Sequence, residues 1–139
     1  MESVTFEWYD AWVLAAVIYA SDGSESVPLW RVVGSADGLN KAIVSRDELE
    51  LAFGRLTRAG YIRAAPDGVA ATEKALALKR PGPPISTIAR AIGARSWSPG
   101  TPMPETPDDT YVSADLYKKA VDKYKKEFWK AYREARDMD

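Results

Sequence analysis

Residues 43–78 hold the sequence pattern that most restricts the fold of this chain. Ser45 and Glu48 have the S-x-x-E spacing of a capping box, in which each side chain satisfies a backbone N–H at the start of a helix. Apolar residues then recur at three- and four-residue intervals and predict a helix over 45–59: Leu49, Ala52, Phe53, Leu56 and Ala59. Gly60 supplies the left-handed residue at which helices commonly end.

A hairpin and a second capped helix are expected after Gly60. Tyr61-Ile62-Arg63 predicts a short strand, Pro66-Asp67-Gly68 a tight turn, and Val69-Ala70-Ala71 the returning strand. Thr72 is a favourable residue at the start of a helix, because its hydroxyl can accept a backbone N–H. We therefore expect a further helix from this position.

Two more helices are expected before the capping box. Apolar side chains at helical spacing predict a first helix over 6–20, so hydrophobic all round that it must be buried on more than one side. Pro28 opens a second helix. Gly34 and Gly38 within it indicate either close packing against another element or a break in the helix. Residues 26–27 are expected to pair with the hairpin as a third short strand.

This order of elements is the winged-helix arrangement. It resembles the core of MarR-like and PadR-like bacterial transcriptional regulators, in which a recognition helix ends in a Gly-(Leu/Tyr)-Ile step, here Gly60-Tyr61-Ile62. In those regulators a hairpin wing follows, and a helix that begins at a Thr, here Thr72, closes the unit. The resemblance covers residues 5–79. It implies a winged helix-turn-helix fold, mainly α with a small β-hairpin, and double-stranded DNA as a ligand.

We expect the chain to divide into three parts. A winged-helix domain occupies 1–79, a Pro-rich strap with a short helix occupies 80–112, and a C-terminal helix occupies 113–139. Seven of the nine prolines lie in the strap, which is typical of an extended linker. Ser113 is expected to cap the last helix, which runs to about Arg136.

One side of the C-terminal helix is apolar and aromatic over a length that the winged-helix domain cannot cover by itself. We therefore expect a homodimer through this helix, which the terminal helices of the MarR-like and PadR-like dimers also imply. The residues expected at the interface are Tyr117, Val121, Tyr124, Phe128, Trp129 and Tyr132. Trp129 departs from the apolar stripe and lies among lysines and arginines. It either packs within the dimer or on the strap, or it stacks on a base or fills a partner's pocket.

The outward face of helix 45–59 is the surface expected to meet DNA. The side opposite its apolar stripe presents Asp47, Leu51, Gly54 and Arg58, with Arg55 at its edge. The side chains expected to contact a major groove are Arg46, Arg55, Arg58 and Arg63. The alternative for Arg55 and Arg58 is that they are merely solvated.

The distribution of charge favours a second function. Residues 1–79 carry eleven acidic and eight basic side chains, although a DNA-binding domain usually carries a basic footprint. The expected hairpin tip has no basic residue, and Leu51 is an apolar residue on the expected reading face. The alternative to a DNA-binding regulator is thus a winged-helix module that binds another protein through the face of helix 45–59.

The composition argues against catalysis, metals and membranes. The chain contains no cysteine and no histidine, so neither a thiol nucleophile nor the commonest general base and zinc ligand is present. No glycine-rich phosphate loop occurs, and no apolar run approaches the ~18 residues of a membrane span. We therefore expect a cytoplasmic protein that is not an enzyme and needs no metal or cofactor.

Overall fold

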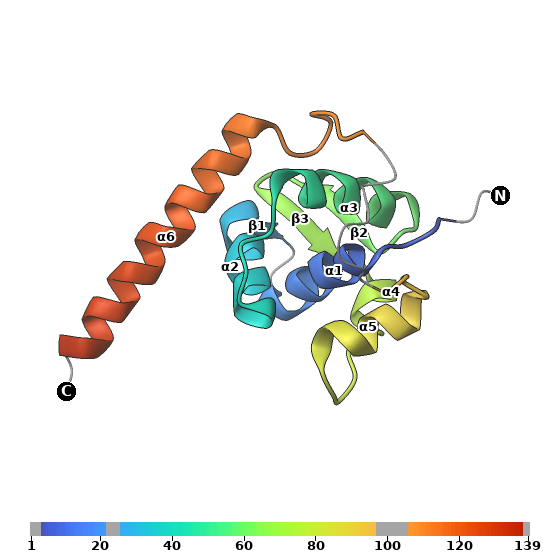
Figure 1. The fold of residues 1–139 in the computed structure, drawn as a ribbon, viewed down its shortest axis with the longest axis horizontal. Coiled ribbons are helices and arrows are strands. Elements are labelled where there is room, and N and C mark those ends of the chain that lie inside the picture. The colour runs from blue at the N-terminus through green and yellow to red at the C-terminus, as the bar shows by residue number, and fades with distance from the viewer. Residues whose placement is uncertain (1–3, 22–25, 97–105, 138–139) are drawn as a thin grey trace.

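The computed structural model describes residues 4–21, 26–96 and 106–137. Its elements are, in chain order, α1 (Trp8–Ala20), β1 (Val27–Pro28), α2 (Leu29–Asn40), α3 (Arg46–Arg58), β2 (Ile62–Ala65), β3 (Gly68–Ala71), α4 (Glu73–Leu76), α5 (Pro84–Ile92) and α6 (Ala114–Asp137). The described chain is mainly helical with a small antiparallel sheet, as the sequence predicts. Figure 1 shows α1 to α5 gathered around the sheet, with α6 extending along one side.

The predicted helix caps around α3 and α4 are confirmed. The Ser45 hydroxyl oxygen accepts the Glu48 N–H at 3.1 Å, and the Glu48 carboxylate accepts the Ser45 N–H at 2.9 Å. Gly60, with φ of +82°, is the left-handed residue after the last turn of α3. The Thr72 hydroxyl oxygen accepts the Ala75 N–H at 3.3 Å and begins α4.

The sheet has the strand order β1-β3-β2, and both pairings are antiparallel. The pairing of Val27 with Val69 confirms the predicted third strand. Ala65 pairs with Gly68, so the hairpin turns through the two residues between them. A Cβ at Gly68 would lie 2.1 Å from the Val27 carbonyl oxygen, and this close approach of β1 and β3 therefore requires glycine.

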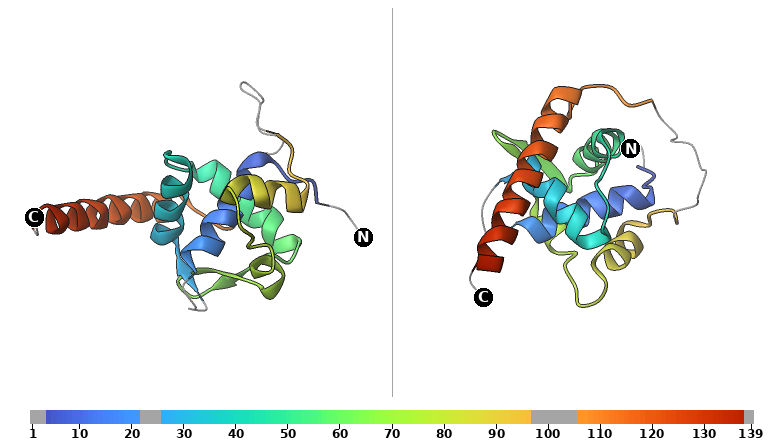
Figure 2. Two further views of the ribbon diagram at one scale, coloured as in Figure 1. Left: turned by 90° about the horizontal axis from the view of Figure 1, so that it is seen from below. Right: turned by 60° about the vertical axis from the view of Figure 1, so that its left-hand side comes forward.

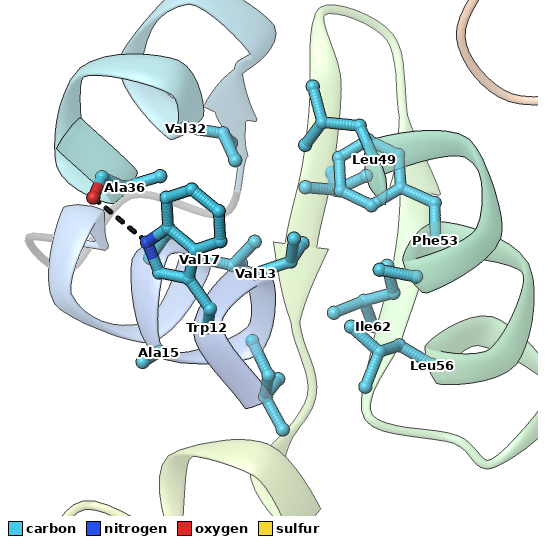
Figure 3. Close-up of a cluster of buried hydrophobic side chains, with 14 of the residues drawn as sticks. Trp12, Val13, Ala15, Val17, Val32, Ala36, Leu49, Phe53, Leu56 and Ile62 are labelled. Carbon is cyan, nitrogen blue, oxygen red and sulfur yellow. Dashed lines mark hydrogen bonds between the residues drawn. The ribbon is translucent and has the colours of Figure 1, made fainter. Parts of the chain in front are cut away.

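The core is built around α1, of whose 13 residues ten are buried. This burial agrees with the all-round hydrophobicity of its sequence. On one side, Trp12 Nε1–H donates to the Ala36 carbonyl oxygen of α2 at 2.9 Å, so the polar atom of the indole is satisfied inside the core (Figure 3). On another side, Phe53 and Leu56 of α3 are 3% and 0% exposed, which confirms the predicted apolar side of that helix.

The helix α2 runs without a break through both of its glycines. Gly34 provides the close packing that was one of the two expected explanations, because a Cβ there would lie 2.8 Å from Cδ1 of Tyr124 on α6. Gly38 has no such neighbour within 4 Å. The missing side chain at Gly34 thus lets α6 approach the backbone of α2.

The expected Pro-rich strap is described over 80–96 and 106–112. Its short helix is α5, which packs on α1 and buries Ile88 to 1% exposure. Gly93, with φ of +68°, ends α5 in the left-handed conformation. Trp97, which we expected to anchor the strap on the body, lies outside the described residues.

The helix α6 has 24 residues, so it is about 36 Å long. The Ser113 hydroxyl oxygen accepts the Leu116 N–H at 3.2 Å, which confirms the predicted cap. The first half of α6 packs against α2, and the left panel of Figure 2 shows its second half extending past the other elements. Neither α6 nor any other helix in the described ranges is apolar over a length sufficient to cross a membrane.

Leu56→Ala should lower the free energy of unfolding by about 2–5 kcal/mol, because it leaves a cavity at a fully buried position of α3. Chemical denaturation measures this difference. Leu76→Ala makes the same substitution at an exposed position and should cost no more than about 0.5 kcal/mol. A loss below about 1 kcal/mol for Leu56→Ala would contradict the packing of α3 on the core.

Candidate functional site

Arg55, one of the four arginines expected to contact DNA, is buried in the core. Its side chain is 2% exposed. Its Nη1 donates to the two carboxylate oxygens of Asp10 on α1 at 3.0 and 3.1 Å, and to the Tyr9 hydroxyl at 2.8 Å. The expected position of Arg55 at the edge of the outward face is therefore wrong, since the side chain points inward to pair with α1.

The cluster around Arg55 is an ion pair at neutral pH. Burial raises the pKa of Asp10 to about 6, although the Glu7 N–H and the Arg55 guanidinium both lower it. Above that pH, Asp10 is a carboxylate that also accepts the Glu7 N–H at 2.7 Å. Burial acts to lower the pKa of Arg55, but Tyr9 and Asp10 hold it above its ordinary value. The pair therefore ties α1 to α3 through opposite charges.

Residues 106–112, here called the covering segment, lie across the outward face of α3. Arg46, at the start of α3, holds this segment. Its Nη1 donates to the carbonyl oxygens of Asp108 and Val112 at 2.8 and 3.0 Å. The same nitrogen forms an ion pair with Asp109 at 2.8 Å. Arg46 is thus engaged within the chain and is not presented to a DNA groove as we expected.

Glu50 holds the covering segment at a second point. Glu50 is only 4% exposed. Its Oε1 accepts hydrogen bonds from the backbone N–H groups of Tyr111 and Val112 at 2.8 and 2.7 Å. Val112 is fully buried and belongs to the hydrophobic core. A charged acceptor that binds two consecutive backbone donors is a strong anchor for an extended peptide.

Arg46, Glu50 and Gly54 form a row along α3 because they follow one another at four-residue intervals. A Cβ at Gly54 would lie 3.4 Å from Cε2 of Tyr111, an ordinary van der Waals contact, so the ring lies directly over this position of α3. Sequence analysis did not identify Glu50 as a functional residue. The row of an arginine, a glutamate and a glycine at this spacing is the signal that could have found it.

The covering segment also changes the position of Leu51. We expected Leu51 on the exposed reading face, but it is 7% exposed. Together with Gly54 and Tyr111, it lines a hollow of about 220 Å³ between α3 and the covering segment. The outward face of α3 is therefore largely covered by the chain itself.

Arg58 and Arg63 are the two of the four predicted arginines that lie exposed. Arg58 is the last residue of α3, and Arg63 lies on β2. The hairpin tip between the strands adds an exposed acidic residue, Asp67. The cations available to nucleic acid from the predicted set are thus two in each chain.

The predicted interface residues on α6 fall into two groups, of which the first packs on the same chain. Tyr117, Val121 and Tyr124 are half-buried against the core. The Tyr117 hydroxyl donates to the Val44 carbonyl oxygen at 2.6 Å, and the Tyr124 hydroxyl donates to the Asp37 carboxylate. Burial, helped by Asp37, raises the pKa of Tyr124 to about 12, so this phenol remains a donor at neutral pH. These three residues are thus half-buried within their own chain, and their place in a dimer interface stays a prediction.

The second group, here called the aromatic ladder, consists of Phe128, Trp129 and Tyr132. These side chains are 50%, 55% and 52% exposed. Their rings stack edge to face, with centroids 5.7 Å apart for both the Phe128–Trp129 pair and the Trp129–Tyr132 pair. Three adjacent exposed aromatic residues are unusual on a monomer and are typical of an interaction surface.

Within the described ranges, no group of three His, Cys, Asp or Glu side chains could hold a metal ion. Comparison of the chain with models of protein families, with curated proteins and with solved structures gives no match. The function must therefore be inferred from the surfaces of α3 and α6.

Arg55→Met should lower the free energy of unfolding by about 3–5 kcal/mol, because it leaves the Asp10 carboxylate buried without its cation. Arg58→Met removes an exposed arginine from the same helix and should change the free energy by no more than about 0.5 kcal/mol. Urea denaturation of both variants at pH 7.5 or above tests this difference. Similar, small losses in the two variants would show that the buried pair does not stabilise the fold.

Glu50→Ala should release the covering segment, because two backbone N–H groups lose their acceptor. The cost of such a loss is about 1–3 kcal/mol. Hydrogen exchange of the Tyr111 and Val112 amides should become faster, and Glu50→Gln, which keeps an acceptor oxygen, should retain most of the protection. Unchanged exchange in Glu50→Ala would exclude this role for Glu50.

Proposed function

We propose that this chain is a winged-helix protein–protein interaction module that forms a homodimer and does not read DNA through α3. The observation that carries the proposal is the covering segment. A major groove of about 12 Å accommodates one helix of about 10–12 Å in diameter. A helix with an extended peptide fixed to its outward face is too thick for that groove. Because Arg46 and Glu50 hold the peptide in place, α3 does not present a bare face.

The charges near α3 support the same proposal. Arg46 and Arg55 are engaged in ion pairs within the chain, which leaves Arg58 and Arg63 from the predicted set. Affinity for DNA comes largely from cations that neutralise phosphates. An acidic excess over residues 1–79 opposes such binding further.

The aromatic ladder supports the homodimer. It lies on the half of α6 that extends past the body, where the left panel of Figure 2 shows no other element beside it. Burying these three side chains against a second chain removes a large apolar surface from water. A symmetric pair of identical chains is the commonest way to cover such a surface.

A DNA-binding transcriptional regulator is the second candidate, and the exposure of Arg58 and Arg63 is the observation that favours it. The resemblance to MarR-like and PadR-like regulators points in the same direction. A dimer would then offer four arginines. The logarithm of its affinity would fall with the logarithm of salt concentration with a slope no steeper than about 4.

Sedimentation velocity tests the homodimer. At tens of micromolar, the full chain should sediment as a dimer. Phe128→Ala combined with Tyr132→Ala should give a folded monomer, because it removes two of the three aromatic rings that a second chain would cover. Arg80→Ala combined with Arg90→Ala changes two exposed residues away from α6 and should remain dimeric. A monomeric full chain would refute the homodimer.

Fluorescence anisotropy with a labelled random duplex at low salt tests the exclusion of DNA. We expect no binding, because the outward face of α3 is covered and few cations remain. The second candidate instead predicts binding with a salt slope of about 4, which Arg58→Ala would lower by about 2. Binding of that kind would replace the proposed function.

A further inference from the structure

We propose that the aromatic ladder of each chain docks into an apolar groove of the second copy. This groove, here called the hairpin groove, lies between α3, the β2–β3 hairpin and the start of α6. The inference rests on the homodimer proposed above and adds to it the place where each ladder is bound.

The hairpin groove has the size and chemistry of a site for aromatic side chains. Its volume is about 490 Å³, within the usual range of about 300–1,000 Å³ for binding pockets. The apolar side chains that line it include Leu29, Phe53, Val69, Tyr111 and Leu116. Leu116 is 53% exposed at this site, so the groove has an apolar wall that the chain itself leaves open to water.

The ladder cannot reach the hairpin groove of its own chain. Leu116, at the start of α6, lines the groove, and Trp129 lies 13 residues later in the same continuous helix. This separation is about 20 Å along the axis. Figure 1 and the left panel of Figure 2 both show the C-terminal half of α6 pointing away from the body. A ladder and a groove that cannot meet within one chain can meet between two.

The charges of the two surfaces are complementary. Residues 125–136, which contain the ladder, carry five basic and two acidic side chains. Among the described residues that line the hairpin groove, Asp67 alone is charged. The adjoining hollow, which shares Tyr111 with the groove, adds the exposed Asp108 and Arg58, whose charges offset each other, so Asp67 supplies the net charge. A basic and aromatic helix therefore meets a groove that is apolar at its centre and acidic at its edge.

A twofold axis relates the two contacts. When the ladder of one copy lies in the hairpin groove of the other, the reciprocal contact forms as well. Each dimer then contains two identical contacts between a ladder and a groove, as an isologous interface requires. The competing arrangement is a ladder that packs only on the second copy's ladder, in which the hairpin groove has no part.

Two single substitutions separate these arrangements. Trp129→Ala removes the central ring of the ladder, and Ala64→Arg places bulk and positive charge in the hairpin groove from an exposed position on β2. Arg90→Ala and Ala77→Arg are the matched controls at exposed positions outside the two surfaces. The dimer dissociation constant of each variant is measured by sedimentation, with circular dichroism and thermal unfolding as the measure of folding.

We expect each of the two test variants to dimerise at least about tenfold more weakly than the full chain, and the controls to be unchanged. The decisive sample is an equimolar mixture of the Trp129→Ala and Ala64→Arg chains. One intact ladder and one intact groove remain in the mixed dimer, so it should form more tightly than either variant alone. If Trp129→Ala weakens the dimer but Ala64→Arg does not, or if mixing restores nothing, the groove is not the site of docking. A monomeric full chain refutes the homodimer itself, which is a different result.

Discussion

The ion pair between Asp10 and Arg55 is the interaction on which the arrangement of the helices depends. The helix α1 is apolar on almost every side, so hydrophobic burial alone leaves its rotation about its own axis weakly determined. A buried carboxylate, however, requires a partner of opposite charge. Arg55 supplies that partner from α3 and so selects one rotation of α1. In that rotation the Trp12 indole N–H donates to the Ala36 carbonyl oxygen of α2. One polar contact thus joins α1 to α2 and another joins α1 to α3, both within the apolar core.

The same helix that carries Arg55 also positions the C-terminal part of the chain. Arg46 and Glu50 bind the covering segment, and this segment leads directly into α6 through the buried residue Val112. The start of α6 is therefore determined by contacts on the outward face of α3. The outward face of α3, which a DNA-reading helix leaves open, is here used to bind a segment of the same chain. This use also explains why one face of α3 holds both an arginine and a glutamate, since each of them binds the covering segment.

Local features of the chain could be predicted from the sequence, whereas long-range pairings could not. The caps at Ser45 and Thr72 and the turn at Gly60 depend on residues only a few positions apart, so short motifs identify them. Arg55 finds its partner 45 residues away, and helical spacing alone placed it at a solvent-facing edge. The stripe on α6 was predicted correctly as apolar. The periodicity of α6 does not show which half of the stripe packs on α2, because that depends on the close contact between Gly34 and Tyr124. The winged-helix assignment and the choice between DNA and protein partners stay predictions.

The contact between Gly34 and the Tyr124 ring lies near the middle of α6, so the C-terminal half of the helix is fixed only at its inner end. The distance from Tyr124 to the last residue of the helix is about 20 Å. A tilt of about 10° at the held end therefore moves the free end by about 3 Å, which is comparable to the width of an aromatic ring. The position of the free end is thus sensitive to how the Tyr124 ring lies against Gly34. Small changes in packing on α2 are converted into larger displacements at a distance from the core.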